Sequence, residues 1–132
     1  VGELPQPTLA DVTTLVAESR RAGMDVELRQ ELAGTTPDLL GRTGYRIVQE
    51  ALTNTRKHAP GAEVQVTLSG GPGDGLSVEV RNSAPARTPL AGRTSGQGLV
   101  GLAERVALAE GRLEHGPAAG GWRLAAWLPW PP

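Results

Sequence analysis

The stretch Tyr45-Arg-Ile-Val-Gln-Glu-Ala-Leu-Thr-Asn-Thr-Arg-Lys-His-Ala59 combines a packing face and a polar face on one predicted helix. A polar stripe along this helix consists of Glu50, Asn54 and Lys57, with His58 beside it. A carboxylate, an amide and an ammonium at this spacing can hold a hydrated Mg²⁺ ion and the phosphates it carries, because hard cations take oxygen ligands. The alternative is an ordinary solvated helix face. At about 100° per residue, the apolar side chains share a broad face that borders the stripe: Ile47, Val48, Ala51 and Leu52.

A second stretch, Gly96-Gln97-Gly98-Leu99-Val100-Gly101-Leu102-Ala103-Glu104-Arg105, places glycines at the start of another predicted helix. Glycine lets the backbone approach a ligand closely, and the free N–H groups at a helix start attract anions. A phosphate bound at residues 98–101 would use both properties. The alternative is that these glycines serve only helix capping and tight packing.

Length and composition exclude several classes of protein. The 132 residues suit a single domain, with residues 1–7 as a loose leader. The net charge is -1 and the basic residues are dispersed, so the sequence predicts no basic patch that would bind nucleic acid. The absence of cysteine excludes disulfides and thiolate metal sites. No apolar run approaches the roughly 20 residues that span a bilayer, so we expect the chain as given to be soluble.

Hydrophobic periodicity and turn residues predict the order of the elements. Thr8 caps the first helix and Gly23 ends it. Thr36 is expected to cap the long helix, with Pro37 at its first position, and Gly111 to end the last helix. The predicted order describes an open sheet covered on one face by helices. Its members are a helix over 9–22, a strand over 24–32, a helix from about 38 to 59, strands over 62–68 and 76–80, a mobile loop over 82–95, a helix over 98–110, and strands over 112–115 and 122–128.

Both motifs resemble those of one family. Ile47-Val48-Gln49-Glu50-Ala51-Leu52-Thr53-Asn54 followed by Lys57-His58-Ala59 is similar to the N box of NarL/DesK-type sensor histidine kinases. The stretch from Gly96 to Arg105 resembles their glycine-rich G2 box, and the order and separation of the two boxes agree. This resemblance places the chain in the Bergerat-fold ATPase superfamily. The implied fold is α+β, a two-layer sandwich with a mixed sheet of about five strands and three main helices on one face.

The resemblance also implies ATP and Mg²⁺ as cofactors, and an ATP lid at about 83–95. Asn54 would coordinate Mg²⁺, Glu50 would hold a metal-bound water or assist as base, and Lys57 would contact phosphate oxygens. The full set of implied nucleotide contacts is Lys57, His58, Asn82, Ala84, Gly96, Gly98, Leu99, Val100, Gly101 and Leu102.

Two residues depart from the family's pattern. Asn82 stands where the family carries an aspartate that binds adenine, in Asn82-Ser83-Ala84 instead of Asp-x-Gly. Trp122 stands where many relatives carry a threonine that assists this aspartate. An asparagine oxygen can accept from the adenine 6-amino group while its NH₂ donates to N1. The alternative is that Asn82 only caps a turn.

His58 and His115 are the only histidines. His58 belongs to the N box and His115 lies in a predicted strand, so we expect neither to be a phosphoacceptor. The resemblance then implies a catalytic portion that acts on a dimerisation and phosphoacceptor domain of the same parent kinase, and on a response regulator through the full-length protein. This chain would be monomeric, and it would be cytoplasmic even if the parent kinase is membrane-bound. The alternatives are a serine kinase or ATPase of the same fold, or an interaction module that has lost nucleotide binding.

Overall fold

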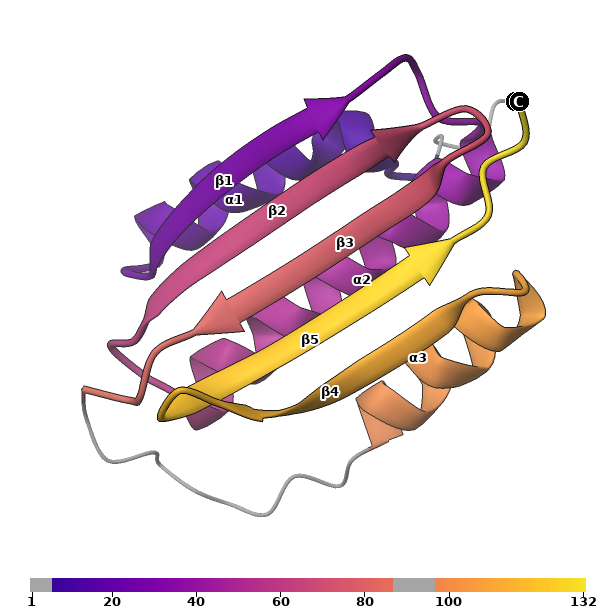
Figure 1. The fold of residues 1–132 in the computed structure, drawn as a ribbon. Coiled ribbons are helices and arrows are strands. Elements are labelled where there is room, and N and C mark those ends of the chain that lie inside the picture. Colours follow the sequence, from indigo (N-terminus) through magenta and orange to yellow (C-terminus); the bar gives the residue numbers. More distant parts are fainter. Residues whose placement is uncertain (1–5, 87–96) are drawn as a thin grey trace, which may run out of the picture.

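Five strands form one mixed sheet, and the helices pack on one of its faces (Figure 1). The computed structural model describes residues 6–86 and 97–132. The strand order is β1-β2-β3-β5-β4; β1 runs parallel to β2 and the remaining pairs are antiparallel. This confirms the expected fold class. The elements are η1 (Leu9–Asp11), α1 (Val12–Arg21), β1 (Asp25–Leu32), α2 (Asp38–His58), β2 (Glu63–Gly71), β3 (Gly75–Asn82), α3 (Gln97–Leu108), β4 (Arg112–Ala118) and β5 (Gly121–Leu128).

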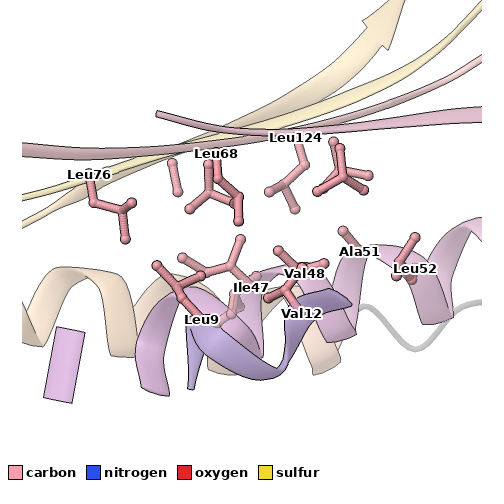
Figure 2. Packing of buried hydrophobic residues seen from close by; sticks show 14 of the residues in the cluster. Leu9, Val12, Ile47, Val48, Ala51, Leu52, Leu68, Leu76 and Leu124 are labelled. Atoms are coloured by element: carbon pink, nitrogen blue, oxygen red, sulfur yellow. The ribbon is translucent and has the colours of Figure 1, made fainter. Parts of the chain in front are cut away.

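The core lies between the sheet and α2, the long central helix. Figure 2 shows the apolar face of α2 directed at the sheet, where Leu68, Leu76 and Leu124 are each 0% exposed. The alternation predicted for the strands places these leucines on the inner face, because successive strand residues point to opposite sides. The predicted packing face of the long helix is therefore confirmed, and it comprises Ile47, Val48, Ala51 and Leu52.

The start of the first helix follows its predicted cap. The Thr8 hydroxyl accepts from the amide of Ala10 at 3.4 Å, and the Thr8 amide donates to the Asp11 carboxylate at 2.9 Å. This reciprocal arrangement satisfies donors that a helix start leaves free. Its first turn, η1, is a 3-10 helix, and α1 continues from it.

Two predicted helix ends are wrong in detail. Pro37 is the cap of α2 rather than its first residue, and no side chain caps this helix. Thr36 packs instead against Gly41, where an added Cβ would lie 2.9 Å from the threonine hydroxyl. At the end of α3, Glu110 adopts the left-handed conformation, with φ of 62°. Gly111 donates to the Val106 carbonyl at 2.8 Å, and its missing side chain lets the chain pass close to β5.

The outer face of the sheet is polar. Glu79 pairs there with Arg123 at 2.7 Å and with Arg81 at 3.2 Å. Trp127 lies on the same face beneath Arg112, whose guanidinium is 5.2 Å from the ring centroid. Among the described helices, none is long and apolar enough to cross a bilayer.

Candidate functional site

The polar stripe of α2 lies along the border of its buried face, as the sequence predicts. Glu50, Asn54 and His58 are half-buried, whereas Lys57 is exposed. The last turns of α2 therefore present a carboxylate, an amide, an ammonium and an imidazole from one helix. Figure 1 shows this end of α2 beneath the end of β3 and the beginning of β5.

The start of α3 lies directly against this stripe. A Cβ added at Gly98 would overlap the Oε1 atom of Glu50 and would lie 2.6 Å from its Cδ atom. Only glycine lets the backbone approach the carboxylate so closely. Gly101 differs, because an added Cβ would meet nothing within 4 Å. The structure thus brings the two motifs together through Glu50 and Gly98, which are 48 positions apart in the sequence.

The other residues of the glycine-rich stretch divide between core and surface. Leu102 is 4% exposed and Leu99 packs against the same core, so both side chains hold α3 on the sheet. Val100 is 59% exposed. Gly96 and residues 87–95 of the expected lid lie outside the described residues.

The described beginning of the expected lid is held by Pro60 and by Glu63, the first residue of β2. The Ser83 amide donates to the Glu63 carbonyl at 2.9 Å, and the Ala86 amide donates to the Pro60 carbonyl at 3.1 Å. Ala84, a predicted nucleotide contact, is exposed between them. These bonds hold residues 83–86 close to the last turn of α2.

Asn82 joins β3 to α2. Its amide nitrogen donates to the Ser83 carbonyl at 2.9 Å, and its oxygen lies 3.4 Å from the hydroxyl of Thr55. That hydroxyl also donates to the Ala51 carbonyl at 3.0 Å, and a single proton cannot serve both acceptors fully. The Asn82 side chain therefore bonds locally, and it retains one N–H and part of its acceptor capacity for a ligand.

Thr55 is a site residue that the sequence analysis missed. It is 5% exposed and lies on the buried side of α2, where it contacts Asn82. A polar residue on an otherwise apolar helix face was the available signal, because a buried hydroxyl needs a partner.

His58 carries an unsatisfied polar atom. Its Nε2 atom is buried and has no hydrogen-bond partner, and within residues 6–86 and 97–132 no other side-chain atom shares this condition. A buried polar atom lowers the stability of the fold unless a ligand or another part of the chain forms a hydrogen bond with it. His58 lies at the same end of α2 as Asn54 and Lys57.

The donor set suits Mg²⁺ held through water. The described residues contain no cluster of three or more His, Cys, Asp or Glu side chains that could enclose a metal. Mg²⁺ usually keeps several waters and takes one or two protein ligands together with substrate phosphates. One amide and one carboxylate, beside a helix start that favours anions, match this mode of binding.

Comparisons with known proteins agree on the fold. No protein-family model matches this sequence, and no curated protein matches it. The blue-light activated histidine kinase of Erythrobacter litoralis EL346 superposes with a TM-score of 0.70 at 17% identity, over 93% of this chain and 42% of that one. The mycobacterial sensor histidine kinase MprB gives 0.64 at 21%, over 93% and 95%. A nucleotide-free catalytic domain of the histidine kinase ThkA gives 0.64 at 18%, over 94% and 92%.

These structural neighbours are histidine kinase catalytic domains, and the chain shares their fold. The chain covers 42% of the Erythrobacter protein and 65% of that protein's histidine kinase domain. At these identities the likeness extends to the fold and not to individual residues.

Proposed function

We propose that this chain is the ATP-binding catalytic domain of a two-component sensor histidine kinase of the NarL/DesK type. The observation that carries the proposal is the contact between Glu50 and the backbone of Gly98, which joins the polar stripe to a helix start. A site for a metal-bound triphosphate needs both features side by side, oxygen ligands for the cation and N–H donors for the phosphates.

Each residue then has a distinct task. Asn54 offers its amide oxygen to Mg²⁺, and Glu50 holds a water of the metal's shell. Lys57 places an ammonium beside phosphate oxygens, and His58 donates or accepts through the Nε2 atom that lacks a partner. Bound Mg²⁺ would neutralise charge on the phosphates, which is what phosphoryl transfer chiefly requires.

The acceptor histidine belongs to another domain of the parent kinase in this proposal. His115 is exposed but lies on the strand β4, and His58 is half-buried at the end of α2, so neither is an exposed histidine on a helical hairpin. The isolated chain should therefore bind nucleotide but transfer little phosphate. Its physiological partners would be the dimerisation domain and, through the full-length protein, a response regulator.

Calorimetric titration with a non-hydrolysable ATP analogue, with and without Mg²⁺, tests this function. Asn54→Ala should weaken the Mg²⁺-dependent binding about tenfold or more, which is ~1.4 kcal/mol. Stability should change little, because the amide of Asn54 is only half-buried. Gln49→Ala, which removes an amide elsewhere on the same helix, is the matched control. Equal Mg²⁺-dependent affinity of Asn54→Ala and the parent would refute the metal assignment.

A further inference from the structure

The inner face of the sheet carries a partly uncovered aromatic side chain at the end nearest the candidate site. Trp122 lies on β5 on the same side as Leu124 and Leu128, which are fully buried. Trp122 itself is only half-buried, although it packs against the core cluster. The helices that cover the rest of this face leave part of the indole open.

Trp122 is the direct partner of Asn82 in the register between β3 and β5. Its ring also lies 5.4 Å from the ring of His115 on β4, with an angle of 34° between the two planes. The indole is therefore close to β4, and Asn82 is its neighbour on β3, the strand on the other side of β5. A flat apolar surface thus adjoins a hydrogen-bonding group, on the inner face of the sheet.

The other two tryptophans have different surroundings. Trp127 occupies the outer face beneath Arg112, and Trp130 is 4% exposed in the core. The sequence has no phenylalanine and a single tyrosine, Tyr45. Tyr45 lies in a hollow formed with Asp11 and Glu18, away from the glycine-rich stretch. Among the described residues, Trp122 is therefore the aromatic surface available to a ligand at the site.

We propose that Trp122, supported by His115, is the surface on which the nucleobase stacks; this inference rests on the proposed function. Aromatic side chains bind bases by stacking with little preference among them, because every base has a π-face. The Asn82 amide already donates to Ser83, so its capacity to bind a base edge is reduced. Stacking then supplies most of the affinity for the base, and the site takes purine nucleotides with weak discrimination between adenine and guanine.

Removing the ring should weaken base binding while leaving phosphate binding unchanged. The probes are a non-hydrolysable ATP analogue and inorganic tripolyphosphate, each with Mg²⁺, titrated into the parent chain and three variants by calorimetry. Trp122→Leu should bind the ATP analogue about tenfold more weakly or worse, as expected for the loss of one base stack. Trp122→Phe, which keeps an aromatic ring, should stay within about threefold. Trp127→Leu, the same change on the opposite face of β5, should match the parent.

Tripolyphosphate separates base stacking from a structural effect. All four proteins should bind it equally, because it has no base to stack. A parallel loss of tripolyphosphate and ATP-analogue affinity in Trp122→Leu, or no loss of either, would overturn the proposal. The parent alone provides a second test, which is independent of how the variants fold: ATP and GTP analogues should bind with similar affinity, and a UTP analogue several-fold more weakly.

A strong preference for adenine over guanine in the parent would contradict stacking as the main source of base affinity. Another outcome is that the parent binds tripolyphosphate and yet binds none of the three nucleotide analogues more tightly than tripolyphosphate. That result would refute base stacking, while the phosphate site would remain supported. A parent that bound no Mg²⁺ nucleotide and no tripolyphosphate would instead refute the proposed function, and this inference with it.

Discussion

Gly98→Ala should destabilise the protein, whereas Gly101→Ala on the same helix should stabilise it. Replacing a helical glycine by alanine ordinarily gains roughly 0.5–1 kcal/mol. Gly101 can realise this gain, because an added Cβ meets nothing within 4 Å. At Gly98 the new methyl would overlap the Glu50 carboxylate, and overpacking of this kind costs about 1–3 kcal/mol. The free end of Glu50 can move, so we expect a net loss of about 1 kcal/mol in the free energy of unfolding.

A double-mutant cycle with Glu50→Ala isolates this contact. Truncating Glu50 removes the obstacle, so Gly98→Ala in that background should stabilise the helix as Gly101→Ala does. The expected coupling is about 1–3 kcal/mol, within the range for residues in contact. Urea unfolding followed by circular dichroism measures each of the four free energies. Equal stabilisation by Gly98→Ala in both backgrounds would show that Glu50 and Gly98 do not touch.

Three further outcomes are expected. Asn82→Asp should raise the preference for ATP over GTP by about 1 kcal/mol, because a carboxylate repels the guanine oxygen; an unchanged ratio of the two dissociation constants would show that residue 82 does not contact the base. Leu124→Ala should cost about 2–5 kcal/mol in urea unfolding, since the side chain is 0% exposed, and a loss well below this would contradict the core packing. The pKa of Tyr45 is raised above 10.0 by burial and then by the carboxylates of Glu18 and Asp11. The unfolded chain therefore releases this proton at lower pH than the folded chain, so stability is full below pH 10.0 and falls as pH rises through the folded pKa. Tyr45→Phe should remove that part of the fall in urea unfolding measured against pH, and an identical fall in parent and variant would contradict it.

The sequence predicted those parts of the fold that depend on local periodicity. Apolar residues recur on one face of α2 over many turns, beside a clear polar stripe. The sequence alone therefore predicted which face of this helix is buried. Thr8 and Asp11 are close in sequence, and their reciprocal bonds follow from residue type.

Features that depend on contacts between distant segments were not predictable in this way. Thr36 and Pro37 had the composition of a helix start, yet packing against Gly41 drew the threonine away from the cap position. Gly111 was predicted to end α3, but Glu110 takes the left-handed turn, and the missing side chain of Gly111 lets the chain pass close to β5. In both cases tertiary packing overrode a local propensity.

The sequence motifs predicted which residues belong to the candidate site. The contacts between these residues became known only from the three-dimensional structure. Spacing on α2 gave Glu50 and Asn54, but nothing local could show that Gly98 lies against Glu50. The contact of Thr55 with Asn82 joins a helix to a strand end, and residue types alone do not reveal such a pair. The resemblance identified Trp122 as a departure, and the register then placed it opposite Asn82.

An NMR titration of the ¹⁵N-labelled chain with a non-hydrolysable ATP analogue tests the central claim most directly. With Mg²⁺ present, the largest amide shifts should map to the end of α2, the end of β3 and the start of α3, with Asn54, Asn82 and Gly98 among them. Omitting Mg²⁺ should weaken these shifts, and amides beneath the outer face, such as that of Ser77, should not move. No shift at any nucleotide concentration, or shifts confined to the outer face of the sheet, would contradict a nucleotide site between the two motifs.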